Sequence, residues 1–209
     1  MHPEQLHPAL ALIRERTSTS RFDPSFPLSN AAIHDLIGYA SEAPSSYNLQ
    51  NWRFIVVKSA VNKETLQGLS YGQQQVADAA ITVIVCGTLD PHRRIRAAMQ
   101  PFRDDGYIDD SDLDEWVRDA ETSFEDNPTK QRDEAVRSAS LAAMTLMIAA
   151  QAMGLVSAPL GGFDIDAVCR QFGIRASEMP VMLVAIGRAA PGNWPRKRRR
   201  RVEEMLVVV

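Results

Sequence analysis

The chain has 209 residues, of which 45% are hydrophobic, and its formal net charge is −3. A chain of this length and composition can bury one full core, so we expect one domain. The small net charge gives no reason to expect a nucleic acid or a membrane as a partner of the whole surface.

The first half of the chain alternates predicted helices and strands. Apolar residues at helical spacing predict helices over residues 4–15 and 30–41. A β-branched and aromatic run predicts a buried strand over residues 53–58. A short helix near residues 63–69 and a second strand over residues 80–87 are expected to follow.

The second half is mainly helical. Amphipathic helices are predicted over residues 91–99 and 112–124, and a long helix rich in Ala, Leu and Met over residues 133–153. Gly154 is expected to end that helix, and residues 182–187 predict a third strand. Helices flanking a sheet of few strands indicate a single α+β domain.

Residues 103–114 hold six aspartates among twelve residues. This density of negative charge is typical of a mobile loop or lid, and equally of an ordinary solvated surface. The sequence alone leaves both alternatives open.

Cysteine usage and hydropathy indicate the cellular compartment in which the protein is expected. Cys86 and Cys169 lie in apolar surroundings, so buried reduced thiols are expected rather than a disulfide or a metal site. No basic segment followed by an apolar run marks a secretory signal. The longest apolar stretch, residues 141–153, is too short to cross a bilayer. We therefore expect a soluble, cytoplasmic protein without a membrane partner.

Four segments carry groups suited to an anionic or polar ligand. Residues 16–22 hold two arginines and four hydroxyls, which suit a phosphate or, equally, the cap of a helix. Residues 44–50 combine hydroxyls and carboxamides, which also favour turns. The glycines at 161–162 would let backbone amides approach a ligand, or form a plain turn. Residues 196–201 are six cations that suit an anion or a nucleic acid, and the apolar residues of 202–209 should hold them against the body.

Five short motifs follow one another in a specific order. They are Arg-x-Ser from residue 16, Ala-Pro-Ser-Ser-x-Asn-x-Gln-x-Trp-x-Phe from residue 43, Gln-x-Gln-Val-x-Asp-Ala from residue 73, Ala-x-Gly-Leu with Pro-x-Gly-Gly-Phe up to residue 163, and the basic C-terminal stretch. Together they resemble the FMN-dependent nitroreductase family over nearly the whole chain, least clearly within residues 93–130.

The resemblance implies an α+β, nitroreductase-like fold. Its central, mostly antiparallel sheet would be flanked by helices, and two chains would form an interlocked homodimer with FMN at the interface. Residues 1–209 would form a single FMN-binding domain with a helical or lid excursion at about 91–130.

The resemblance also implies which residues would bind FMN. Those expected at the phosphate and ribityl chain are Arg16, Thr17, Ser18, Ser20, Lys197 and Arg199. Those expected to reach the flavin from the other subunit are Pro44, Ser45, Ser46 and Asn48. Gln73 and Gln75 would contact the pyrimidine edge, and Pro159, Leu160, Gly161 and Gly162 would lie along the ring.

Three positions depart from the family pattern. Ser20 stands where a Lys or Arg is common, Gly72 where an Asn is frequent, and Gly161 replaces an acidic residue found in some members. Arg21 or the additional arginines of the tail could compensate for the cation absent at Ser20.

The implied activity is an FMN-dependent oxidoreductase. It would transfer hydride from NADH or NADPH through flavin N5 to a nitroaromatic, a quinone or a similar acceptor by a ping-pong mechanism. No catalytic side chain and no metal site are predicted. The aromatic candidates for the acceptor pocket are Phe102, Tyr107, Trp116 and Phe124, although helix packing explains the last two equally well. The alternatives are a flavin-binding or anion-binding protein without turnover, and a flavin-dependent dehydrogenase of the same fold.

Overall fold

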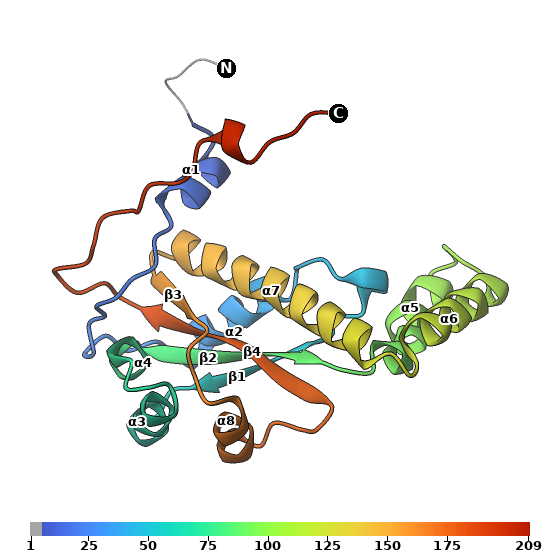
Figure 1. The fold of residues 1–209 in the computed structure, drawn as a ribbon, viewed down its shortest axis with the longest axis horizontal. Helices are drawn as coiled ribbons and strands as arrows, with labels where there is room; N and C mark the ends of the chain where they lie inside the picture. Colours follow the sequence, from blue (N-terminus) through green and yellow to red (C-terminus); the bar gives the residue numbers. More distant parts are fainter. Residues whose placement is uncertain (1–5) are drawn as a thin grey trace.

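A four-stranded antiparallel sheet lies at the centre of the computed structural model, which describes residues 6–209 (Figure 1). The strand order is β1-β2-β4-β3. The strands are β1 (Trp52–Val57), β2 (Ile81–Thr88), β3 (Val156–Leu160) and β4 (Glu178–Gly187). Every pairing is antiparallel, which confirms the predicted sheet type.

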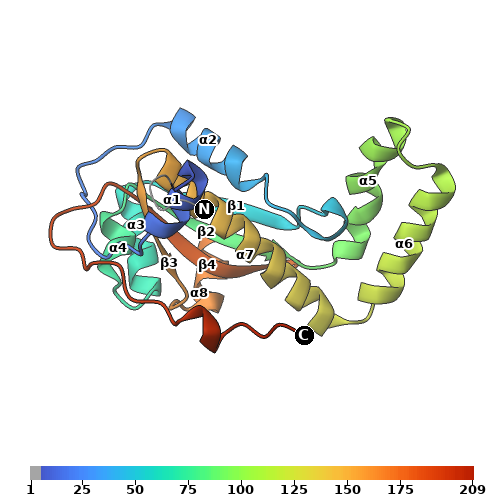
Figure 2. The same ribbon diagram turned by 90° about the horizontal axis from the view of Figure 1, so that it is seen from above.

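Helices cover both faces of the sheet, as Figures 1 and 2 show. On one face lie α2 (Asn30–Ala40) and α7 (Pro128–Ala152), and on the other α3 (Ala60–Leu69), α4 (Gln74–Asp78) and α8 (Ile165–Phe172). Alternate residues of β2 point to opposite faces of the sheet and pack into two separate hydrophobic cores. Val83 and Val85 pack toward α2 and α7, whereas Ile84 and Cys86 pack into the opposite core.

The long helix α7 lies directly against β2. A Cβ at Gly87 would come within 2.4 Å of the carbonyl oxygen of Ala135, so only glycine permits this approach. Asn127 caps the helix by accepting a hydrogen bond from the backbone N–H of Lys130, and α7 therefore begins five residues before the predicted start. Among residues 6–209, α7 alone is long and apolar enough to span a membrane, and half of its most apolar window is buried in the fold.

A helical hairpin projects beyond the end of the sheet (Figure 2). It consists of α5 (Ile95–Asp104) and α6 (Asp110–Phe124), preceded by a 3-10 turn over Pro91–Arg94. The acidic segment is the turn of this hairpin and not a long loop. Asp109 and Asp112 form a capping box at the start of α6, and Arg103 pairs with Asp110 at 2.7 Å.

Three elements were not predicted from the sequence: β3, α4 and α8. Pro159 interrupts the apolar pattern of β3, but β3 pairs only with β4 and lies at the edge of the sheet, where a proline is tolerated. Strand β4 begins four residues before the predicted start, because its pairing with β2 continues through Pro180 by a register shift that leaves Val181 unpaired opposite Val85 and Cys86.

The chain ends depart from the prediction in two ways. Helix α1 (Pro8–Glu15) begins after the predicted start, and positions 4 and 5 lie outside the described residues. The C-terminal apolar residues do not pack on the body of their own chain. Met205 and Leu206 are 60% and 58% exposed, and the three final valines are more exposed still.

Both cysteines are free thiols. Cys86 is fully buried in the sheet, and this burial raises the pKa of its thiol to about 12. Cys169 on α8 is only partly buried, so the prediction of a buried thiol is confirmed for Cys86 alone.

Candidate functional site

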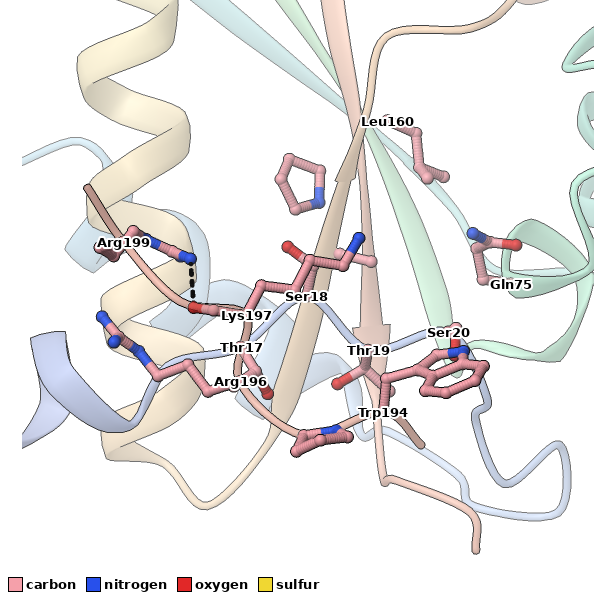
Figure 3. A pocket seen from close by; sticks show the side chains of 13 residues that line it. Thr17, Ser18, Thr19, Ser20, Gln75, Leu160, Trp194, Arg196, Lys197 and Arg199 are labelled. Carbon is pink, nitrogen blue, oxygen red and sulfur yellow. Dashed lines mark hydrogen bonds between the residues drawn. The ribbon is translucent and has the colours of Figure 1, made fainter. Parts of the chain in front are cut away.

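A pocket of about 290 Å³ lies between the segment after α1 and the C-terminal tail (Figure 3). Eight of the residues that line it were predicted from the sequence: Thr17, Ser18, Ser20, Gln75, Pro159, Leu160, Lys197 and Arg199. The others are Thr19, Ala158, Trp194, Pro195 and Arg196. Four segments that are far apart in the sequence therefore meet at one site: residues 17–20, Gln75, residues 158–160 and residues 194–199.

One wall of the pocket consists of residues 17–20, and contacts with the edge strand β3 hold it in place. Ser18 forms a parallel bridge with Ser157, and the backbone N–H of Thr19 donates to the carbonyl of Ser157 at 3.1 Å. Because this bridge fixes the backbone, the hydroxyls of Thr17, Ser18 and Ser20 are placed along the pocket.

The opposite wall of the pocket is the start of the tail, and the side chain of Asn193 holds it in place. Its Oδ1 accepts hydrogen bonds from the backbone N–H of Ser20 at 2.8 Å, from the backbone N–H of Arg21 at 2.9 Å and from the Ser20 hydroxyl at 3.2 Å. Its Nδ2 donates to the carbonyls of Arg21 and Ala190. This one amide joins the start of the tail to the segment after α1.

Positive charge is concentrated beside this pocket. Arg16 is partly buried, and its Nη1 is a buried donor without a hydrogen-bond partner. Burial lowers the pKa of Arg16, and the nearby Arg199 and Arg196 lower it further. Three guanidinium groups that repel one another, one with an unpaired buried donor, are stabilised by an anion bound among them.

The pocket has two chemically different ends, which Figure 3 displays. Arg196 and Arg199 extend toward one side, and Nη1 of Arg199 donates to the carbonyl of Lys197 at 2.8 Å. Ser20, Gln75 and Trp194 lie toward the other side, and the side chain of Lys197 extends between the two sides. This arrangement suits an elongated ligand with an anion at one end and an uncharged polar group at the other.

The two glycines predicted to lie along the ring follow β3 next to this pocket but do not line it. A Cβ at Gly161 would meet no atom within 4 Å, so neither close packing nor a positive φ requires a glycine there. The side chain of Gln73 donates to the carbonyl of Gly162 at 2.6 Å and to that of Ser70 at 3.0 Å. Gln73 therefore holds the glycine segment in place and does not face the pocket.

The predicted loop residues Pro44, Ser45, Ser46 and Asn48 lie elsewhere. Their segment includes a 3-10 turn over Ser46–Asn48 beside α5, at the end of the sheet opposite the pocket (Figures 1 and 2). A single chain does not bring these residues to the other predicted ones.

The backbone of this loop is unusual. Tyr47, Asn48 and Gln50 have φ angles of 50°, 51° and 45°, a region that non-glycine residues rarely adopt. The Ser45 hydroxyl accepts from the backbone N–H of Gln50 at 2.9 Å and supports this conformation. Strain of this kind occurs at binding sites more often than elsewhere.

The four predicted aromatic residues divide into two pairs. Phe124 is 5% exposed in the core of the α5–α6 hairpin, and Trp116 packs against Tyr47 at a centroid distance of 6.4 Å. Phe102 and Tyr107 stack at 4.7 Å and are exposed, and Phe102 lines a hollow together with Asn48. The first pair is explained by packing, and the second remains a candidate for the acceptor site.

Sequence reasoning did not select Trp194 or Arg196 as site residues. The available signal was their position, since Arg196 is the first residue of the cationic run and Trp194 lies two residues before it. Within residues 6–209, no group of three or more His, Cys, Asp or Glu side chains is arranged to hold a metal ion.

Comparison with known proteins identifies the fold and its family. The model of the nitroreductase family matches residues 13–188. The chain belongs to this family. Among its relatives is a protein of Bacillus subtilis (strain 168) provisionally named NAD(P)H nitroreductase YodC, which is 33% identical over 180 residues, or 86% of this chain and 89% of that protein.

Two solved structures show the same nitroreductase fold. YdfN from Bacillus subtilis, provisionally described as a nitroreductase, has a TM-score of 0.91 and 29% identity over 96% of this chain and 98% of its own. A protein from Exiguobacterium sibiricum 255-15, crystallised in complex with FMN, has a TM-score of 0.87 and 25% identity over 99% of both chains.

Proposed function

We propose that this nitroreductase-family protein is an FMN-dependent oxidoreductase that uses NADH or NADPH to reduce a small electrophilic acceptor. The observation that carries the proposal is the buried, unpaired guanidinium nitrogen of Arg16 beside a pocket lined by hydroxyls and by Lys197 and Arg199. A phosphate monoester fits this set of donors. The FMN complex of the Exiguobacterium relative supports the same cofactor.

The residues present fit FMN at both ends of the pocket. Arg16, Lys197 and Arg199 would bind the phosphate, and the hydroxyls of Thr17 and Ser18 would complete its oxygen shell. Gln75 and Ser20 offer neutral hydrogen-bonding groups to the ribityl chain and to the ring. The open space at Gly161 would allow the flavin ring to approach the backbone amides that follow β3.

When bound, FMN would supply the redox chemistry, accepting hydride from the nicotinamide and passing electrons to the acceptor. The residues of the chain itself would bind the cofactor, orient it and shield it from water. We assign no general acid or base, because the lining side chains are hydroxyls, amides, apolar groups and cations. The acceptor would be a nitroaromatic, a quinone or a similar electrophile.

We further propose that the working form is a homodimer. The loop that contains Ser45, Ser46 and Asn48 lies far from the pocket of its own chain, but a second copy could present it. Exposed apolar residues on α1 and α7 and in the tail give such a copy a surface to cover, among them Ile13, Leu141 and Leu206. In this dimer, residues 1–209 of each copy would form a single domain from which the α5–α6 hairpin projects.

The test is direct. Purified protein should be yellow with flavin absorbance, and NADH or NADPH added under argon should bleach it. Steady-state rates at several acceptor concentrations should give parallel double-reciprocal lines, since the nicotinamide leaves before the acceptor binds. A colourless protein that ignores added FMN would refute the proposal, and flavin binding without bleaching would favour the alternative of a binding protein.

A further inference from the structure

The tail contributes one more cation to the lining of the pocket than the two that were assigned to the cofactor from the sequence. Lys197 and Arg199 were predicted to bind the cofactor, but Arg196 also lines the pocket. Arg196 is close enough to Arg16 to lower the pKa of that guanidinium. No carboxylate within residues 6–209 forms an ion pair with Arg196, whereas Arg200 and Arg201 both pair with Glu204.

The segment after α1 brings no cation into the lining of the pocket, and Arg16 lies only beside it. At Ser20 the side chain is a hydroxyl, and it is already engaged by Oδ1 of Asn193. The positive groups that line the pocket all come from residues 196–199 of the tail. The position of the tail therefore decides how much charge meets a bound anion.

One side chain fixes that position. Asn193 makes five hydrogen bonds, of which four reach Ser20 and Arg21 and one closes the turn onto Ala190. Arg196 follows only three residues later. Its own side chain is long and mobile in solution, so the entropy lost on binding an anion is smaller when its backbone is already held.

We infer that Arg196 is a phosphate-binding residue of the FMN site and that Asn193 is the positioning residue that holds it there. The inference rests on the proposed function, because it concerns the same pocket. It assigns to Arg196 the role of the cation that is absent at Ser20. The interaction is with the phosphate alone, since Arg196 and Arg199 extend toward one side of the pocket and the neutral groups lie toward the other.

The experiment compares FMN with riboflavin, which has the same ring and ribityl chain but no phosphate. Dissociation constants are measured by flavin fluorescence for the wild type, Arg196→Gln and Arg198→Gln. Arg198 is the matched control, since it carries the same charge in the same tail but does not line the pocket. Arg196→Gln should weaken FMN binding about tenfold and leave riboflavin binding unchanged, because one charge-assisted hydrogen bond is lost.

Asn193→Ala tests the positioning role. It should reduce the preference for FMN over riboflavin. Together with Arg196→Gln it should lose less than the sum of the two single losses, because part of the loss in Asn193→Ala is the contribution of Arg196. A purely structural role would weaken riboflavin binding equally and would add to the effect of Arg196→Gln.

The outcomes separate the two proposals. An unchanged FMN preference in Arg196→Gln, or an equal loss in Arg198→Gln, would overturn the inference about Arg196 while leaving the flavin enzyme intact. Additive effects of the two substitutions would overturn the role of Asn193. A wild-type protein that binds neither FMN nor riboflavin would refute the proposed function and this inference together.

Discussion

The two regions that carry the predicted cofactor-binding residues are built in opposite ways. The pocket at Thr17–Ser20 is closed by contacts within one chain, namely the bridge to Ser157 and the bonds of Asn193. The loop at Ser45–Gln50 contains three left-handed residues, and it faces shallow hollows and the α5–α6 hairpin. One region forms a pocket lined by segments of the same chain, and the other lies away from that pocket.

From this difference we expect that a single chain forms only part of the cofactor site. Strained and exposed backbone of this kind occurs often at ligand-binding sites. We expect the cofactor of one copy to stabilise the loop of another. Substitutions in the two regions should therefore differ in size and in whether they complement each other.

The largest effect is expected at Arg16. Arg16→Gln removes the partly buried cation whose Nη1 has no protein partner, and FMN affinity should fall on the order of a hundredfold. Arg14→Gln is the control, because Arg14 is an exposed cation in the last turn of α1. Isothermal titration with FMN measures both, and equal losses would show that the charge acts only at long range.

The second effect tests whether the loop and the pocket belong to different copies. A Ser46→Ala, Asn48→Gly variant removes two polar side chains while glycine retains the positive φ at position 48, and FMN affinity should fall about tenfold or more.

Mixing this variant with Arg16→Gln gives the decisive result. In a dimer that shares its sites, random pairing restores about a quarter of all sites, since half of the dimers then carry one intact site. Flavin content at limiting FMN reports the recovery. No recovery on mixing and refolding would place both regions in the same chain's site.

A smaller effect is expected for the surface that would join the copies. Met205 and Leu206 are exposed in the tail, and changing both to Ser should weaken dimer association about tenfold or more if they are buried there. Sedimentation over a range of concentrations measures the dissociation constant. Val61→Ser on α3 is the control, since Val61 is an exposed apolar residue outside the proposed interface. Unchanged association in the tail variant would exclude these residues from the interface.

The smallest effect is expected in the hairpin beside the loop. Asp109→Ala removes the capping box of α6 and should lower the free energy of unfolding by about 1 kcal/mol. Urea denaturation measures this change, and Asp109→Asn should recover most of it because Asn is an equally good cap. FMN affinity should remain unchanged, and a large loss would show that the hairpin itself contacts the cofactor.

Much of the architecture could be predicted from periodicity because the buried faces dominate it. Strands β1 and β2 and helices α2 and α6 were located within a few residues. Strand β3 was missed because Pro159 and the adjacent glycines resemble a turn, and only its edge position makes the proline acceptable. Local patterns carry no information about which strand lies at the edge.

The candidate site was predictable in its chemistry but not in its assembly. Hydroxyls and cations near both ends of the chain indicated a phosphate, and the structure does bring Ser18 and Lys197 to one pocket. Asn193 could not be selected, because its role depends on hydrogen bonds to Ser20 and Arg21 across more than 170 residues of sequence. The apolar tail was expected to pack on its own body, since a sequence does not distinguish a surface for the same chain from one for another copy.

The open space at Gly161 has a consequence for altering this protein. Because an added Cβ would touch nothing within 4 Å and the backbone there needs no positive φ, the fold should accept other residues at this position. A carboxylate, an amide or a small apolar group could each be introduced next to the proposed ring with little effect on stability. Position 161 is therefore a place where the reduction potential of a bound flavin could be changed independently of folding.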